Sequence, residues 1–137
     1  MLTFNCDYDR GAHPAILQRL TETNRVSQPG YGRDEYSAAA RDKIRAAFAC
    51  PQSDVWFLVG GTETNAIVID TLLNTHEGVI AAETGHVSVH EAGAIEHTGH
   101  KVLTLPGYNG KLKAEDVAAY LRRFYADESW QHMVMTP

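Results

Sequence analysis

The sequence predicts an α/β fold with a mostly parallel sheet. Short runs of apolar residues at 55–59, 79–82, 102–105 and 133–135 favour strands, and longer stretches with helical periodicity separate them. Strands that alternate with helices are typical of parallel sheets, whose strands are buried on both faces. At 137 residues the chain is long enough to bury a sizeable core.

Two helices are expected before the first strand. His13-Pro14 begins the first helix, because proline suits the first helical turn, where its missing N–H is not needed. A glycine-containing loop at 28–32 ends this helix, and the second helix begins near Asp34. The expected apolar faces consist of Ile16, Leu17 and Leu20 in the first helix and Tyr36, Ala40, Ile44 and Phe48 in the second.

The first strand leads into the stretch that says most about function. After the apolar run 55–59, Gly60 and Gly61 allow a tight turn, and Thr62 is expected to cap the helix that follows. The backbone N–H groups at such a helix N-terminus form a natural site for phosphate or another anion. The alternative is an ordinary strand-to-helix turn that uses glycine only for its geometry.

The second half of the chain repeats the alternation of strand and helix. A polar segment at 83–86 follows the strand 79–82, and ligands of open α/β sheets bind outside the carboxyl ends of strands. Helix and turn are expected up to Gly99, then a strand at 102–105, a loop at 106–110 and a helix with Val117, Tyr120, Leu121 and Phe124 on one face. The strand at 133–135 has no helix after it, so we expect the N-terminal part of a longer protein.

Composition argues against several classes of protein. The net charge of −5 argues against a general nucleic-acid surface. No run reaches the roughly 20 apolar residues of a membrane-spanning helix, and the N-terminus lacks the basic start of a signal peptide. Cys6 and Cys50 form no metal or redox pattern, which favours a reduced, cytoplasmic setting.

The 7 histidines raise the question of a metal site. His86 and His90 are one helical turn apart and Glu91 follows them, whereas zinc proteases place the acid between the two histidines. We therefore favour solvated helix histidines and predict no metal site. The chain also lacks a serine-nucleophile motif, a Walker lysine motif and the Gly-x-Gly-x-x-Gly spacing. A phosphorylated cofactor or a sugar phosphate remains as the candidate anion.

Four motifs follow one another in an order that resembles a known family. They are Gly11-Ala12-His13-Pro14, Gln28-Pro29-Gly30-Tyr31-Gly32-Arg33-Asp34, Gly60-Gly61-Thr62-Glu63-Thr64-Asn65 and Ala82-Glu83-Thr84-Gly85-His86-Val87. The chain thereby resembles the low-specificity threonine aldolases, which belong to the β-eliminating lyase group of fold-type-I pyridoxal-phosphate (PLP) enzymes. The resemblance implies the N-terminal part of a three-layer α/β/α large domain with a mostly parallel sheet, incomplete in this chain. Residues 1–35 would form an N-terminal helix-and-loop segment, and 36–137 the first part of the PLP-binding domain.

The resemblance also implies which residues bind the cofactor. The motif that holds PLP in the family is matched by Gly61, Thr62 and Asn65, and Gly60 stands where the family often has serine or asparagine. His86 matches the imidazole that stacks on the pyridine ring and can take part in proton transfer. Because one small molecule must contact both, we expect the turn at Thr62 and the His86 ring to lie on the same side of the sheet.

Further residues are implied in catalysis and substrate binding. His132 resembles a second catalytic histidine, one that acts on the substrate hydroxyl. Cys6 stands where many relatives have a serine near the substrate carboxylate. Tyr31 and Asp34 lie in a loop that approaches the active site in relatives, often that of the neighbouring subunit.

The implied activity is PLP-dependent cleavage of a β-hydroxy-α-amino acid, with threonine giving glycine and acetaldehyde. The family's cofactor-binding lysine and the carboxylate beside the pyridinium nitrogen lie beyond this chain, and Lys43, Lys101, Lys111 and Lys113 match no such motif. The full-length parent, a dimer or tetramer, would therefore be active and the 137-residue chain alone inactive. The alternatives are another β-eliminating lyase, or a truncated module that only binds phosphate ligands.

Overall fold

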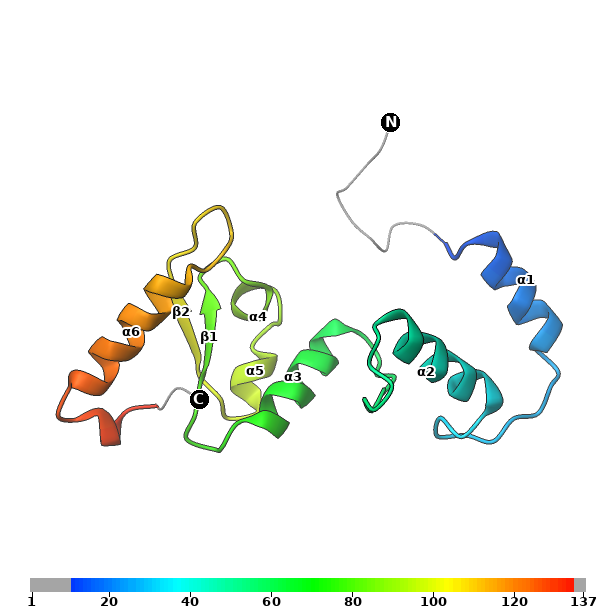
Figure 1. Ribbon diagram of the computed structural model, residues 1–137, viewed down its shortest axis with the longest axis horizontal. Helices are drawn as coiled ribbons and strands as arrows, with labels where there is room; N and C mark the ends of the chain where they lie inside the picture. The colour runs from blue at the N-terminus through cyan, green and yellow to red at the C-terminus, as the bar shows by residue number, and fades with distance from the viewer. Residues whose placement is uncertain (1–10, 135–137) are drawn as a thin grey trace. The chain divides into compact units, whose positions relative to one another are not determined.

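The computed structural model describes residues 11–134, which divide into two compact units with the boundary between Phe57 and Leu58. The first unit contains the helices α1 (Pro14–Thr23) and α2 (Glu35–Ala47) (Figure 1). The second contains α3 (Gly61–Leu72), β1 (Val79–Ala82), α4 (His86–Val89), α5 (Ala94–His97), β2 (Val102–Leu105), α6 (Ala114–Ala126) and the 3-10 helix η1 (Trp130–His132). The predicted segment boundary at residue 35 stays a prediction.

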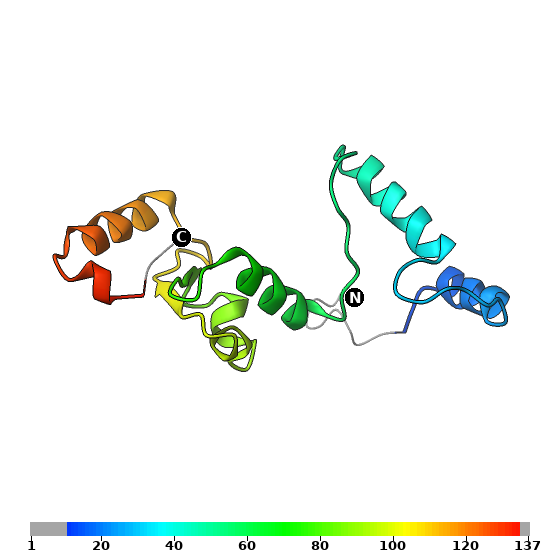
Figure 2. The same cartoon turned by 90° about the horizontal axis from the view of Figure 1, so that it is seen from below.

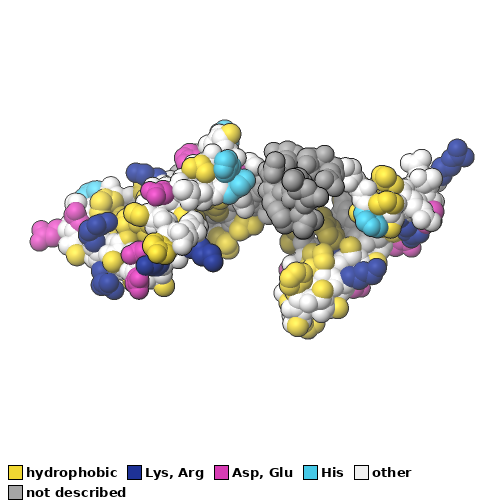
Figure 3. All heavy atoms as spheres, turned by 90° about the horizontal axis from the view of Figure 1, so that it is seen from above, with side chains coloured by type: hydrophobic (Ala, Val, Ile, Leu, Met, Phe, Trp, Pro, Cys, Tyr) yellow, Lys and Arg dark blue, Asp and Glu magenta, His cyan; other side chains and the backbone are white. Residues whose placement is uncertain are grey.

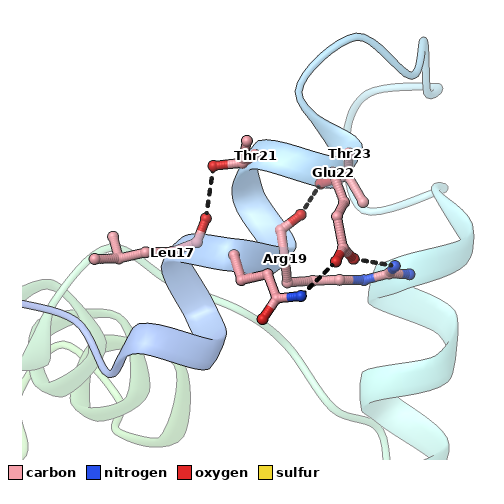
Figure 4. Close-up of polar contacts among 6 residues, drawn as sticks. Leu17, Arg19, Thr21, Glu22 and Thr23 are labelled. Carbon is pink, nitrogen blue, oxygen red and sulfur yellow. Dashed lines mark hydrogen bonds and ion pairs between the residues drawn. The ribbon is translucent and has the colours of Figure 1, made fainter.

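Helix α1 begins with Pro14 in its first turn, as the sequence predicts. The His13 ring caps it, because Nδ1 accepts a hydrogen bond of 3.2 Å from the Ala15 N–H. Side chains stabilise the rest of the helix locally (Figure 4). The Thr21 hydroxyl donates to the Leu17 carbonyl at 3.0 Å, and Arg19 and Glu22 form an ion pair at 3.3 Å.

Helix α2 is also confirmed, and its start has a clear cause. Asp34 is the N-cap residue: its Oδ1 accepts a hydrogen bond from the Ser37 N–H at 2.8 Å, and its Oδ2 accepts one from the Ser37 hydroxyl at 2.7 Å. These two hydrogen bonds lower the pKa of Asp34. The helix ends before Ala49, whose φ of 51° turns the backbone into the left-handed region.

The predicted buried strand at 55–59 is wrong. Residues 53–58 have no regular secondary structure, and the side chains of Trp56 and Val59 are 81% and 85% exposed. A strand exists only through hydrogen bonds to a neighbouring strand, and within the described residues 11–134 this segment has no such neighbour. The apolar run fits a strand by composition, but it lacks the partner that would make it one.

The two remaining central strands are confirmed and pair in parallel. Val79 lies opposite Val102, and Ala82 lies opposite Leu105. The core of the second unit forms around this pair and consists of Ala81, Ala82, Ile95, Leu103 and Leu105. Figure 1 shows α6 on one side of the strands and α4 and α5 on the other, and α3 packs against α5 in both Figure 1 and Figure 2. The predicted α/β class with parallel strands is therefore confirmed.

A buried histidine, His100, contacts both α3 and the turn between α3 and β1. His100 is 3% exposed, and its Nδ1 lies 2.9 Å from the Glu77 carbonyl oxygen. Its Nε2 lies 3.3 Å from Asp70 Oδ1, so both ring nitrogens have partners. One of the many histidines is thus structural, and it connects α3 to the start of β1.

Two further details differ from the sequence prediction. Helix α3 begins at Gly61 with Gly60 as its N-cap residue, so Thr62 lies inside the first turn and does not cap the helix. Gly60 has a φ of 82°, which suits glycine because it has no Cβ. Met133 and Val134 do not form the predicted fourth strand, because within the described residues they pair with neither β1 nor β2. Met135 lies outside the described residues.

The loop at 106–110 and the helix after it follow the prediction. Tyr108 and Lys111 pair through two backbone hydrogen bonds across Asn109 and Gly110, which both have positive φ. Helix α6 carries acidic residues in its first turn and Arg123 in its last, an arrangement that favours the helix dipole.

Candidate functional site

The start of helix α3 presents unpaired backbone donors. Gly60 has no side chain to cap the helix, and among residues 11–134 no acceptor pairs with the N–H groups of Gly61 and Thr62. The Glu63 carboxylate instead accepts the Val59 N–H at 3.1 Å, which fixes the chain just before the turn. A Cβ added to Gly60 or Gly61 would meet no atom of the described residues within 4 Å, so among these residues nothing blocks the approach to the donors. Donors in this arrangement attract an anion.

A buried carboxylate joins this helix to the predicted cofactor histidine. Glu91 Oε1 lies 2.6 Å from Asn65 Nδ2 in α3 and 2.7 Å from His86 Nδ1, the first residue of α4. The Glu91 side chain is 0% exposed, whereas the His86 side chain is 61% exposed. The Nδ1 edge of the imidazole ring is therefore held by the protein, and the side chain remains accessible.

The electrostatics of this cluster favour an ionised Glu91. The hydrogen bond from Asn65 lowers the pKa of Glu91 most, His86 and the Thr62 hydroxyl lower it further, and burial opposes them. An ionised carboxylate only accepts hydrogen bonds. The ring nitrogen that contacts this carboxylate is His86 Nδ1, and which partner donates depends on the tautomer of the ring.

The structure brings together part of the predicted site. Thr62, Asn65 and His86 gather around Glu91, with Gly60 and Gly61 at the start of the same helix. The expectation that the Thr62 turn and the His86 ring lie on the same side of the sheet is therefore met. Sequence reasoning considered Glu91 only as a metal ligand and missed its link to Asn65, which lies 26 positions earlier in the chain.

The remaining predicted residues lie elsewhere. His132 is exposed and ends η1, and within residues 58–134 it makes no hydrogen bond to the Glu91 cluster. Cys6 lies outside the described residues. Tyr31 and Asp34 belong to the first unit. Tyr31 is fully exposed with a φ of 61°, and the Asp34 carboxylate accepts the two hydrogen bonds from Ser37 that start α2.

Tyr31 borders an open hollow in the first unit. This hollow has a volume of about 310 Å³ and is also lined by Arg41, Arg45 and Trp56. Arg41 donates a hydrogen bond of 3.0 Å to the Gly32 carbonyl and so holds the loop that carries Tyr31. The predicted substrate roles of Tyr31 and Asp34 stay predictions.

Residues 11–134 contain neither a candidate metal site nor a candidate membrane span. No group of three or more His, Cys, Asp or Glu side chains in that range is arranged to hold a metal ion. No helix in the described part of the chain has both the length and the apolar character needed to cross a membrane.

Known proteins match this chain in both fold and sequence. A solved structure of threonine aldolase from Leishmania major matches with a TM-score of 0.88 and 42% sequence identity, over 95% of this chain and 37% of that one. The fold is therefore that of a fold-type-I α/β lyase. The chain belongs to the beta-eliminating lyase family, whose model matches residues 11–136.

Curated relatives give the same family. The low specificity L-threonine aldolases of Pseudomonas sp. (strain NCIMB 10558) and Pseudomonas aeruginosa are 32% and 33% identical to the chain over 111 residues. The matched region is 80% of this chain and 32% of each relative. The chain thus spans about a third of the length of the curated relatives it matches.

Proposed function

We propose that the chain is the cofactor-binding part of a PLP-dependent lyase that cleaves threonine to glycine and acetaldehyde. The observation that supports this function best is the buried Glu91 contact, which holds His86 beside the helix that starts at Gly61. The relatives named as threonine aldolases support the choice of substrate.

The start of α3 fits the phosphate group of PLP. The N–H groups of Gly61 and Thr62 have no acceptor within the described residues, and the missing Cβ atoms at Gly60 and Gly61 leave room beside them. A phosphate there would accept hydrogen bonds and would also gain from the positive end of the helix dipole. Gly60, Gly61 and Thr62 are the residues that would hold it.

His86 fits the second half of the cofactor site. Its ring is flat, 61% exposed and fixed at Nδ1 by Glu91, so it can hold a planar heterocycle and offer Nε2 to a proton. When bound, PLP takes up the electron pair left by the breaking Cα–Cβ bond. The chain's own part is to orient the reactants and to accept the hydroxyl proton, at a histidine (His86 through Nε2, or His132 as the family resemblance implies) or through a bound water.

This function requires groups that the chain's own motifs do not supply. A lysine must bind the cofactor, and the described lysines are engaged elsewhere or match no such motif; Lys113, for example, lies 4.6 Å from the centre of the Tyr108 ring. We therefore propose that the complete enzyme is active and that these 137 residues alone are not.

The test compares the chain with the complete gene product. Both would be incubated with threonine and PLP, and acetaldehyde and glycine would be measured, with serine and cysteine as alternative substrates. We expect acetaldehyde and glycine in equal amounts from the complete product and none from the 137-residue chain. Products from serine or cysteine without acetaldehyde from threonine would indicate another β-eliminating lyase. PLP binding without any product would indicate a non-catalytic module.

We also propose that the protein associates with copies of itself. Apolar side chains lie at the surface (Figure 3), and within the first unit Phe48 and Trp56 are 76% and 81% exposed. Exposed apolar surface on this scale marks an interaction site. A dimer or tetramer that binds an amino-acid substrate, without nucleic acid or membrane, fits this surface and the family.

A further inference from the structure

Glu91 is a buried carboxylate in direct contact with the His86 ring. A buried carboxylate is costly unless donors satisfy it, and Asn65 and His86 supply its two shortest hydrogen bonds through the same oxygen, Oε1. The second oxygen, Oε2, has no hydrogen-bond partner within residues 11–134. Without the His86 proton, Oε1 would keep one of these two hydrogen bonds, the one from Asn65.

We propose that Glu91 is a positioning residue that fixes the tautomer of His86. Its carboxylate accepts a hydrogen bond from the Nδ1–H of the imidazole, so the neutral ring carries its proton on Nδ1 and can accept another at Nε2. Asn65 holds the carboxylate in place from α3 and is thus part of the same device. The inference rests on the proposed function only for what His86 Nε2 then contacts.

The competing explanation is purely structural. In that case Glu91 connects α3 to α4 and the protonation pattern of His86 does not depend on it. Stability measurements do not separate the two explanations, because both predict that removal of Glu91 weakens the fold. The position of the proton on the His86 ring does separate them.

The first experiment needs no mutation. Nitrogen-15 NMR of the imidazole side chains, at about pH 8.5 where histidines are generally neutral, reports which ring nitrogen carries the proton. We expect His86 to show a protonated Nδ1 and an unprotonated Nε2, whereas the exposed His97 shows the tautomer mixture of a solvated ring. A proton on Nε2 of His86 in the wild-type chain would overturn the inference.

The second experiment changes the acceptor. Glu91→Met keeps the length of the side chain and removes its oxygens, so the His86 signals should move to those of His97. Glu91→Gln keeps one acceptor oxygen and should restore at least part of the wild-type pattern. Glu96→Gln makes the same charge change at an exposed glutamate in α5 and should leave His86 unchanged. His86 signals that stay unchanged in Glu91→Met would contradict the inference.

A binding measurement links the device to the cofactor. In equilibrium dialysis with the complete gene product, Glu91→Met should bind PLP about tenfold more weakly than the wild type, or more weakly still. This is the effect expected for the loss of a charge-assisted hydrogen bond. If the wild-type protein binds no PLP but carries the Nδ1 proton, the proposed function fails and the tautomer inference stands. If PLP binds but the proton lies on Nε2, the inference fails alone.

Discussion

Asp34 shows how one carboxylate determines where a helix starts. Its two oxygens accept the N–H and the hydroxyl of Ser37, and these bonds lower its pKa below the ordinary value. A lowered pKa in the folded state means that the ionised form stabilises the fold. This contribution is present above the pKa of the unfolded chain, about 3.9, and it is lost as the pH falls below that value.

We therefore predict that α2 loosens in acid through Asp34. Helix content followed by circular dichroism should fall below about pH 4 in the wild-type chain. Asp34→Asn keeps a capping oxygen without a titrating group and should show a weaker acid dependence, whereas Asp34→Ala should lose helix content at every pH. An acid transition of the same size in Asp34→Asn would assign the effect to other carboxylates.

Two glycines of the second unit, Gly61 and Gly78, have different surroundings. A Cβ on Gly61 would meet nothing within 4 Å, but a Cβ on Gly78 would lie 2.6 Å from the Lys101 carbonyl oxygen. The first glycine leaves room for a ligand at the start of α3. The second allows the backbone before β1 to approach the backbone before β2.

Gly61→Ala should separate folding from binding. Since the new methyl group meets no protein atom, stability should stay within about 1 kcal/mol of the wild type or rise slightly, because alanine favours helix. The methyl group would, however, stand beside the amides proposed to hold phosphate. PLP affinity of the complete enzyme should therefore fall about tenfold, measured by dialysis. Unchanged affinity would contradict the phosphate site.

Gly78→Ala should act in the opposite way. The backbone must shift to admit a Cβ that would otherwise lie 2.6 Å from the Lys101 oxygen, so the free energy of unfolding should drop by about 1–3 kcal/mol. Urea denaturation followed by circular dichroism measures this change, with Gly61→Ala as the matched control. Equal stabilities of the two variants would contradict the close approach seen before β1.

Sequence patterns predicted the helices that depend on local signals. Pro14, the Asp34 cap and the apolar stripe of α6 each act within a few residues, and all three helices formed where expected. The run 55–59 failed because a strand depends on a neighbour. Glu91 was missed for a related reason: its partner Asn65 is 26 positions away, and no local pattern links the two.

The exposed apolar side chains predict self-association of the protein. Light scattering with size-exclusion chromatography should give a mass of at least twice the 15.1 kDa of one chain. Trp56→Lys and Val59→Lys place charges on the exposed apolar run and should shift the mass toward that of a single chain, while Glu96→Gln serves as the control. A monomer at micromolar concentration would rule out this surface as an interface between copies.

The hydrogen bond between Asn65 and Glu91 has a consequence for how the second unit forms. Its two ends lie 26 positions apart, with the rest of α3, β1 and α4 between them, so the contact can form only when α3 and the segment after α4 have come together. The His86 imidazole is held through the same carboxylate oxygen. The NMR signal of the His86 ring during refolding would therefore report when Glu91 has reached its place. A nascent chain cannot make this contact until Glu91 has been synthesised.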